Sequence, residues 1–314
     1  MREPDDLYRL EDPEVIAAVP RGDLTMVVAI PGMVDAGGVC RTATGYLRES
    51  LRSLRVASFT SDELIDYRSS RPTVTYDGRR YSALEFQEIA LSLLYDDSEK
   101  PFLLLDGPEP DLRWHQMTEA IISLCDLFDV QRVISMRAVP SEAPHSRTLS
   151  MLTHANEHVL AEDGPIETES EQLFEVPGSF VAVMEVALER AGIRSQGFIA
   201  QIPHYLTRST FPAGALALLR RISATADLEL PLVELGDIVE TSLKLIDGEV
   251  AATPELQAMV ESLEEGYDQR ARDGDGDPSV PDMPTADELG DRFERFLAEN
   301  QDSDHEDGDG RGLR

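Results

Sequence analysis

Short apolar runs alternate along the chain with stretches in which apolar residues recur every three or four positions. A continuous apolar run that ends at Pro-Gly, as residues 24–31 do, is typical of a strand buried on both faces. The expected strands occupy residues 24–31, 55–60, 101–106, 130–139 and 197–202. The expected amphipathic helices occupy residues 37–51, 114–128, 177–191, 212–226 and 232–244. Strands and helices that alternate through short links predict a three-layer α/β/α fold with a mostly parallel central sheet.

Residues 61–85 break this alternation. They contain Arg71-Pro72 and the sequence Tyr76-Asp77-Gly78-Arg79. Asp-Gly is a favoured pair in tight hairpin turns because both positions tolerate positive φ. We therefore expect a small β excursion from the sheet in this stretch.

The chain changes character after about residue 250. Thr253-Pro254 predicts the start of a helix, because Pro suits the first helical position. Residues 273–284 are rich in Gly, Asp and Pro and predict a flexible linker, and a capping box at Thr285–Glu288 precedes a short amphipathic stretch. The expected organisation is an α/β/α domain over residues 1–250, a helical extension over 251–299 and an acidic disordered tail over 300–314.

The short amphipathic stretch has one apolar stripe. The stripe consists of Leu289, Phe293, Phe296 and Leu297. An apolar helix face is stable only when something covers it. The sequence leaves two covers open, namely the chain's own domain and a second copy of the chain.

Acidic residues dominate the composition. The 314 residues include 60 Asp and Glu against 28 Lys and Arg, which gives a formal net charge of −32. This charge excludes a nucleic-acid-binding protein, which needs a basic surface to neutralise phosphates, and it disfavours docking on anionic lipid. The acidity is consistent with salt adaptation or with a protein partner whose contact surface is basic or neutral.

The cysteines and the apolar runs indicate the cellular compartment. Cys40 and Cys125 lie far apart in apolar contexts, which predicts buried free thiols in a reducing environment. Residues 1–6 are acidic rather than apolar, and no stretch of the sequence approaches 18 apolar residues. We therefore expect a cytoplasmic protein with no signal peptide and no membrane span.

The segment Gly32–Gly38 lies where an expected strand meets an expected helix. At this position in an α/β fold, the backbone N–H groups at the start of the helix can bind an anion. The segment lacks both the Gly-x-Gly-x-x-Gly and the Gly-Lys-Ser/Thr patterns. The favoured interpretation is that the glycines allow a tight turn and that Asp35 caps the helix. A small ligand near Gly32–Gly38 is the alternative.

Metal and cofactor motifs are incomplete. His154 and His158, four residues apart, could share a helix face and be joined by His145, but zinc needs three or four convergent ligands. Asp273–Pro284 begins like a calcium loop and has Pro at both decisive positions. No Gly-x-Ser-x-Gly nucleophile motif occurs in the sequence. We therefore predict no metal and no cofactor.

Polar clusters follow several of the expected strands. They are Glu63-x-x-Asp66-Tyr67 with Arg71, Glu109 with Trp114, His145-Ser146-Arg147, and His204-Tyr205. Because parallel strands end at one edge of a sheet, these clusters are expected to converge there. Arg71 and Arg147 are then the expected partners of Glu63, Glu109 or Asp35. Such charge pairs form either a network that fixes loop geometry or a catalytic site.

The catalytic alternative is a phosphorylase- or hydrolase-type enzyme with its site at the strand ends. The candidate residues are Asp35, Glu109, His145, Arg147 and His204. Arg147 would hold an anionic or nucleoside-like substrate, and His145 or His204 would act as the general acid or base. Because no nucleophile is identifiable, the structural network is the favoured interpretation.

In this order, the motifs resemble the proteasome assembly chaperone 2 family, in particular its actinobacterial branch. The match runs from about residue 22 to residue 250. The matching motifs are Gly32-x-x-Asp35-Ala36-Gly37, Glu63-x-x-Asp66-Tyr67 before Arg71-Pro72, Gly107-x-Glu109-Pro110 before Trp114, Pro144-His145-Ser146-Arg147, Val176-Pro177-Gly178-Ser179 and Pro203-His204-Tyr205-Leu206. Each motif is short, and their shared order makes the match specific.

The resemblance implies an α/β/α fold similar to those of nucleoside phosphorylases and peptidyl-tRNA hydrolases, usually in homo-oligomers. Eukaryotic and archaeal relatives help to assemble proteasome α-rings, and similarity of fold to phosphorylases does not transfer their chemistry. For this chain the resemblance implies a non-enzymatic, assembly-chaperone-like protein with a protein partner related to the proteasome. It also implies a homo-oligomer, for which a trimer is the working expectation.

Overall fold

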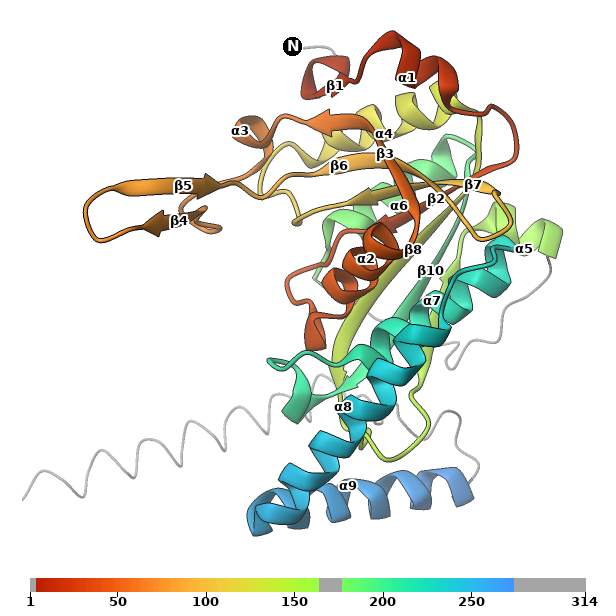
Figure 1. The fold of residues 1–314 in the computed structure, drawn as a ribbon. Coiled ribbons are helices and arrows are strands. Elements are labelled where there is room, and N and C mark those ends of the chain that lie inside the picture. The colour runs from red at the N-terminus through yellow and green to blue at the C-terminus, as the bar shows by residue number, and fades with distance from the viewer. Residues whose placement is uncertain (1–3, 164–176, 274–314) are drawn as a thin grey trace, which may run out of the picture. The chain divides into compact units, whose positions relative to one another are not determined.

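The structure is a computed structural model that describes residues 4–163 and 177–273. An eight-stranded sheet forms the centre of this part of the protein (Figure 1). In spatial order its strands are β1 (Tyr8–Leu10), β3 (Arg52–Phe59), β6 (Ala90–Tyr95), β7 (Pro101–Asp106), β2 (Leu24–Ala29), β8 (Val130–Ser141), β10 (Arg194–Pro203) and β9 (Met151–Ala155). A separate hairpin consists of β4 (Thr73–Tyr76) and β5 (Tyr81–Glu85).

Parallel pairing runs through the middle of the sheet. β2 pairs in parallel with β7 and β8, and β8 pairs in parallel with β10. The outer strands β1, β3, β6 and β9 join in antiparallel fashion. β6 is not among the predicted strands. A tight turn, in which the Asp96 N–H donates to the Lys100 carbonyl at 3.0 Å, joins it to β7, and so short a link permits only an antiparallel pair.

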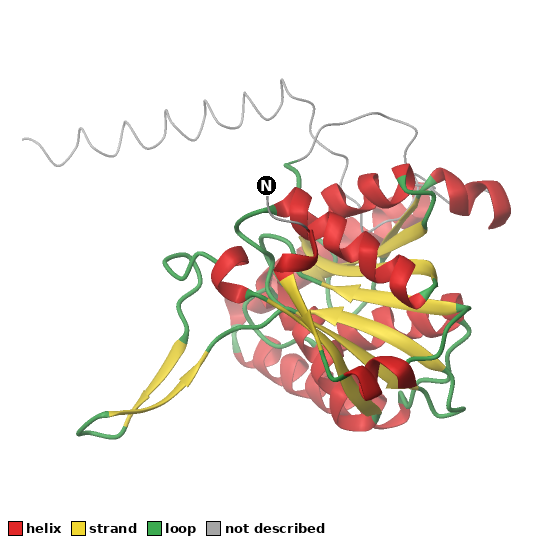
Figure 2. Cartoon of the chain, turned by 90° about the horizontal axis from the view of Figure 1, so that it is seen from above, coloured by secondary structure: helices red, strands yellow, loops and turns green. Residues whose placement is uncertain are grey.

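Helices cover both faces of the sheet and complete three layers (Figure 2). The helices of these layers are α2 (Val39–Ser50), α4 (Trp114–Phe128), α6 (Phe180–Arg190), α7 (Pro212–Ala226) and α8 (Val233–Ala252). α4 and α6 pack on one face of the sheet, and α2 and α7 pack on the other, with α8 against α7. The predicted α/β/α fold is confirmed.

The central strand β2 shows why its sequence is continuously apolar. Met26 and Val28 are buried in the core under α4 and α6, whereas Val27 and Ala29 are buried in the core under α2 and α7. Successive side chains of a strand point to opposite faces, so a strand covered on both sides needs apolar residues at nearly every position.

Most of the predicted elements have the expected bounds. α4 and α7 coincide with the predicted helices, and the Ser179 hydroxyl caps α6 by accepting the Ala182 N–H at 3.3 Å. α8 continues to Ala252, well beyond the predicted end at Lys244, because Ile246 extends the apolar stripe that packs on the α2/α7 core. Three short helices are additional to the predicted set. They are α1 (Pro13–Ala18), α3 (Ser61–Leu64) and α5 (Glu157–Asp163).

The hairpin β4–β5 projects from the body as an arm, in the stretch where a β excursion is predicted (Figure 1). Asp77-Gly78 forms its turn. Gly78 has a φ of 89°, and the Asp77 carboxylate accepts the N–H groups of Arg79 and Arg80, each at 3.0 Å. Every residue of both strands is exposed. The exposed apolar side chains of this arm are Val74, Tyr76, Tyr81, Leu84 and Phe86.

Both cysteines are buried free thiols, as predicted. Burial raises the pKa of Cys125 to about 12, and burial together with the nearby Asp35 carboxylate raises the pKa of Cys40 well above its ordinary value. Because the thiolate is the reactive form, we expect neither thiol of the native protein to react with Ellman's reagent at pH 8. The unfolded protein is the control and should release two equivalents. A fast native reaction would contradict the burial of these side chains.

A break at Thr253, whose backbone is extended (φ −122°, ψ 101°), separates α8 from α9 (Pro254–Asp273). The predicted helix start at Pro254 is confirmed.

Although α8 and α9 each have 20 residues, no helix in the described ranges is long and apolar enough to cross a membrane. Beyond Asp273, the predicted linker, apolar stripe and tail lie outside the described residues, as does most of the calcium-like segment. The domain boundary at residue 250 stays a prediction.

Candidate functional site

Asp35 follows β2 and caps the N-terminus of α2. Its carboxylate accepts the backbone N–H groups of Cys40 at 2.9 Å and Arg41 at 3.1 Å, which are the donors that a helix start leaves unpaired. Gly37 and Gly38 have φ values of 67° and 57°, a left-handed conformation that glycine adopts at little cost. The capping hypothesis is confirmed. The position at which this helix start could bind an anion is occupied by the chain's own carboxylate.

Glu109 follows β7 and caps α6. Its carboxylate accepts the Phe180 N–H at 2.7 Å. The ring of Phe180 in turn meets the Trp114 ring edge-on, with centroids 6.2 Å apart. Glu109 therefore fixes the start of α6 against the start of α4.

The expected pairing of Arg71 and Arg147 with the carboxylates at the strand ends is wrong. Glu63 forms an ion pair with Arg113 at 2.5 Å, and the carboxylates of Asp35 and Glu109 serve as helix caps. Arg71 is exposed on the approach to the arm. Arg147 points instead toward α9, because the loop after β8 runs under the two C-terminal helices.

His145 is buried beneath α8, with its side chain 2% exposed. Its backbone N–H donates to the Tyr205 hydroxyl at 2.9 Å, its Nδ1 lies 2.6 Å from the same hydroxyl, and its Nε2 lies 3.1 Å from an Asp247 carboxylate oxygen. A tyrosine hydroxyl that accepts one bond can donate its own hydrogen to Nδ1, which leaves the Nε2–H for Asp247. Both ring nitrogens are therefore engaged. Burial and the charges of Glu264 and Asp247 raise the pKa of Tyr205.

Arg147 connects the same loop to α9. Its Nε and one terminal nitrogen donate to the two oxygens of Asp268 at 2.8 and 2.9 Å, and its other terminal nitrogen donates to Glu264 at 3.2 Å. The paired contact with Asp268 is the planar fork geometry that makes Arg–carboxylate pairs specific. Ser146 also hydrogen-bonds Glu264. We call residues 145–147 with Tyr205, Asp247, Glu264 and Asp268 the polar junction.

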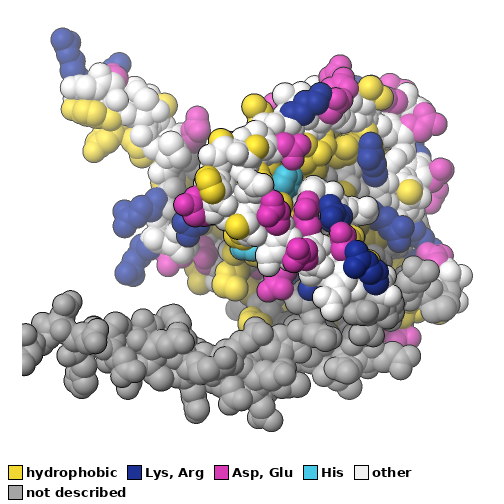
Figure 3. Space-filling model, turned by 90° about the horizontal axis from the view of Figure 1, so that it is seen from below, with side chains coloured by type: hydrophobic (Ala, Val, Ile, Leu, Met, Phe, Trp, Pro, Cys, Tyr) yellow, Lys and Arg dark blue, Asp and Glu magenta, His cyan; other side chains and the backbone are white. Residues whose placement is uncertain are grey.

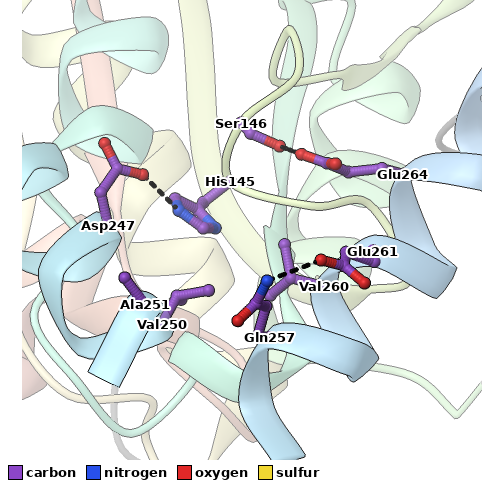
Figure 4. A pocket seen from close by; sticks show the side chains of 9 residues that line it. All are labelled: His145, Ser146, Asp247, Val250, Ala251, Gln257, Val260, Glu261 and Glu264. Carbon is purple, nitrogen blue, oxygen red and sulfur yellow. Dashed lines mark hydrogen bonds and ion pairs between the residues drawn. The ribbon is translucent and has the colours of Figure 1, made fainter. Parts of the chain in front are cut away.

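A cavity of about 240 Å³ lies between the polar junction, α8 and α9 (Figure 4). Its lining residues are His145, Ser146, Asp247, Val250, Ala251, Gln257, Val260, Glu261 and Glu264. His145 meets Asp247 on one wall and Ser146 meets Glu264 on another. Acidic and basic side chains lie interleaved over this end of the molecule (Figure 3). The cavity is acidic, and each of its three carboxylates is bonded: Asp247 to His145, Glu261 to Gln257 and Glu264 to Ser146.

The structure brings together three of the five candidate catalytic residues. His145 and Arg147 lie in the polar junction, and the exposed His204 contacts it through the Tyr205 ring, with centroids 5.5 Å apart. Asp35 and Glu109 lie in two other loops and cap two different helices. A single convergent site of all five residues is therefore not formed.

His154 and His158 do not share a helix face, contrary to the spacing argument. His154 lies on β9, where its Nε2 is 2.8 Å from Glu185, and His158 lies on α5 with its Nε2 2.9 Å from the Glu189 carbonyl. Residues 151–155 pair with β10, and this pairing overrides any helical preference. In the described part of the chain, no group of three or more His, Cys, Asp or Glu side chains is placed to hold a metal ion.

The contact between α9 and the loop should be lost in acid. The hydrogen bonds from Arg147 lower the pKa of Asp268 below its ordinary value of 3.8. Because the pKa of Asp268 is lower in the docked state than in the undocked state, the contact with Arg147 stabilises the docked helix fully above pH 3.8. The contact is lost when the pH falls through the lowered pKa and Asp268 becomes protonated. We expect the NMR signal of the Arg147 Nε–H to be unchanged between pH 7 and pH 5 and to shift below pH 3.8. Asp268→Asn is the control and should lack this transition. A transition between pH 5 and pH 7 would contradict the assignment.

The carboxylates of the polar junction are not among the predicted site residues. Glu264 and Asp268 are four residues apart, so the sequence places them on one face of a helix. The same spacing is typical of any solvated acidic face, and the sequence does not show that this face meets Arg147. The sequence around Asp247 contains no motif that indicates its contact with His145.

These features define an α/β/α protein whose strand-end loops are fixed by helix caps and by the polar junction, with one exposed β arm. The chain belongs to the PAC2 family, whose model matches residues 29–245. The family resemblance predicted from the sequence is therefore confirmed.

Three solved structures from actinobacteria are similar to the chain. A Corynebacterium glutamicum protein of unknown function is 34% identical over 85% of this chain and 98% of its own, with a TM-score of 0.77. A Mycobacterium tuberculosis protein of unknown function is 34% identical over 88% of this chain and 96% of its own, with a TM-score of 0.78. A Mycobacterium tuberculosis proteasome-assembly chaperone homologue is 26% identical over 76% of this chain and 100% of its own, with a TM-score of 0.67. No curated protein matches the chain.

Proposed function

We propose that this chain is a non-enzymatic, assembly-chaperone-like protein of the cytoplasm that binds a protein partner related to the proteasome. The observation that carries the proposal is membership of the PAC2 family together with the similarity to a proteasome-assembly chaperone homologue along that protein's whole length. The net charge of −32 suits a partner with a basic or neutral contact surface.

The geometry of the candidate residues also supports an interaction role. A general acid or base must reach the substrate, whereas the His145 side chain is 2% exposed and both of its ring nitrogens are bonded. Arg147, the candidate anchor for an anionic substrate, already binds Asp268 and Glu264. Asp35 and Glu109 cap helices. The phosphorylase- or hydrolase-type enzyme is therefore not favoured.

The assembly role is tested by deletion and capture. In a strain that lacks this gene, we expect 20S core particles to form more slowly, with incomplete intermediates visible in native gels, and re-expression should restore the rate. Immobilised protein should retain proteasome subunits expressed with it. Normal core assembly in the deletion strain, together with no retained subunit, would refute the proposal.

We propose further that the chain forms a homo-oligomer through its β arm, with a trimer as the expected state. A two-stranded hairpin on its own is marginally stable in water, and this arm exposes Tyr76 and Tyr81 at 60% and 76%. Arg79 and Arg80 at its turn complement the acidic surface of a second copy. An arm that binds a different surface of the next copy makes a head-to-tail contact, and a rotation of one third of a turn between copies closes such contacts into a ring of three.

The variant Tyr76→Ser/Tyr81→Ser/Leu84→Ser tests the arm. We expect light scattering after gel filtration to give the wild type three times its chain mass of 34.7 kDa, and to give the variant a single chain mass. Leu245→Ser is the matched control, because it removes an exposed apolar side chain of α8 rather than of the arm, and it should leave the trimer intact. A monomeric wild type, or a variant of unchanged mass, would refute the role of the arm.

A further inference from the structure

Two polar side chains lie side by side on the sheet face that carries α4 and α6. Side chains alternate along a strand, so Arg137 of β8 points to the same face as Val133, which is part of the α4/α6 core. β8 and β10 pair with Arg137 opposite Ile199 and with Val139 opposite Gln201. Arg137 and Gln201 are therefore diagonal neighbours on adjacent strands and share this face.

Arg137 forms no direct ion pair with a described carboxylate, although the His154 hydrogen bond and the charge of Arg137 together lower the pKa of Glu185. Within residues 4–163 and 177–273, its one side-chain hydrogen bond runs from a terminal nitrogen to the Ser179 hydroxyl at 2.9 Å, and its Nε is buried without an acceptor. Among the described residues no ion pair involves Arg137, although the chain has 60 acidic side chains. By contrast, Arg132 on the same strand binds Asp163 at 2.9 Å. Arg137 is half-buried, and a buried N–H donor such as its Nε is costly unless it is satisfied.

Two further donors are available beside Arg137. Gln201 is 4% exposed, and its amide nitrogen has no hydrogen-bond acceptor in the part of the chain that the structure describes. The Ser179 oxygen already accepts bonds from Arg137 and from the Ala182 N–H, so both of its lone pairs are used and its hydroxyl hydrogen is left to donate. Ser179 also stands at the N-terminus of α6, the positive end of the helix dipole.

The carboxylates near this group are already engaged. Glu185 accepts the Ser135 hydroxyl at 2.6 Å and lies 2.8 Å from the His154 Nε2. Glu109 accepts the Phe180 N–H. The donors of Arg137 and Ser179, which touch one another, and the amide of the neighbouring Gln201 are therefore left without an acceptor among these side chains.

We propose that Arg137, Ser179 and Gln201 bind an oxyanion, the carboxylate or phosphate group of a small-molecule ligand. Such a group carries only acceptor oxygens, and it would receive the guanidinium Nε–H, the serine hydroxyl and the glutamine amide together. The planar guanidinium suits both kinds of oxyanion. This site differs from the candidate anion site at Arg147, whose donors are occupied by carboxylates. It is independent of the assembly role, so either proposal can fail alone.

Titration with inorganic phosphate and, separately, with acetate tests the site. Sodium chloride at equal ionic strength is the baseline, because any salt screens a charge of −32. We expect at least one anion to give saturable NMR shifts in the backbone amides of Val181 and Ala182 and in the side-chain amide of Gln201. Saturation by only one of the two anions identifies whether the site binds a phosphate or a carboxylate group. No saturable shift beyond the chloride baseline with either anion would overturn the proposal.

The variants Arg137→Met and Gln201→Leu test the assigned residues. We expect affinity for the anion to fall at least tenfold in Arg137→Met and several-fold in Gln201→Leu. Arg132→Gln is the control, because it removes an arginine of the same strand whose guanidinium has a carboxylate partner, and it should bind as the wild type does. Unchanged affinity in Arg137→Met would overturn the assignment. Should that variant not fold, the wild-type shifts at Val181, Ala182 and Gln201 decide the question.

Discussion

Gly107→Ala is expected to lower the free energy of unfolding by about 3 kcal/mol or more. Gly107 ends β7 with a φ of 146°, a conformation open almost only to glycine. A Cβ atom at this position would lie 2.6 Å from the Glu88 carbonyl oxygen and 2.7 Å from the Ile89 Cα. Both are backbone atoms, which cannot move aside as the end of a side chain can. Backbone strain at position 107 and steric overlap of the added Cβ with these atoms therefore both destabilise the variant.

Urea and thermal unfolding measure this effect. Gly236→Ala is the matched control, because Gly236 lies inside α8 and an added Cβ would meet no atom within 4 Å. This change should leave stability unchanged or raise it by about 0.5–1 kcal/mol, since alanine favours helices over glycine. If Gly107→Ala unfolds like the wild type, the strand end must relax freely, and the rigid placement of Glu109 two residues later would be in doubt.

Arg147→Met is expected to release α9 from the body of the protein. Val260 is the only described residue of α9 that is buried, so polar contacts carry much of the attachment of this helix. The bonds of Arg147 to Asp268 and Glu264 are the main ones, and Tyr267 adds a bond to the Thr148 carbonyl. Hydrogen exchange followed by mass spectrometry should show the amides of residues 254–273 exchanging roughly tenfold faster, with the central strands unchanged. The Arg147–Asp268 ion pair is partly exposed, and we therefore expect its loss to loosen α9 locally rather than to unfold the whole protein.

Lys244→Met is the matched control for this experiment. Lys244 pairs with Glu240 on the surface of α8 at 2.5 Å, with both side chains about 70% exposed. An exposed pair four residues apart on one helix contributes little, so this variant should exchange as the wild type does. Unchanged protection of α9 in Arg147→Met would show that the remaining contacts, Val260 and the Tyr267–Thr148 bond among them, are sufficient to hold the helix.

Local signals explain which elements could be predicted from the sequence. α7 begins at Pro212 and is followed by Asp227, a left-handed C-cap. α6 has the Ser179 N-cap, so local residues mark boundaries of both helices. β2 is apolar throughout because both of its faces are buried. β9 is short and only partly buried, and it becomes a strand through its pairing with β10. That pairing depends on the three-dimensional arrangement and leaves no periodic signal.

The candidate site could be predicted only in part for a related reason. His145 and Arg147 were identifiable because they follow a strand, and parallel strands carry such residues to one edge of a sheet. Their partners come from α8 and α9, where Asp247 lies 102 residues after His145 and Asp268 lies 121 residues after Arg147. The donors of Arg137 and Gln201 were missed because a polar residue within a predicted strand carries no sign of which group it faces.

The two ends of the main sheet limit how copies of this protein can associate. β1 has three residues and β9 has five, so the outermost strands offer short rows of unpaired backbone groups. Long, flat outer strands invite another chain to extend the sheet, which is a route to aggregation. Here that route is poor, and the proposed contact through the β4–β5 arm would leave the main sheet and its core undisturbed when copies associate.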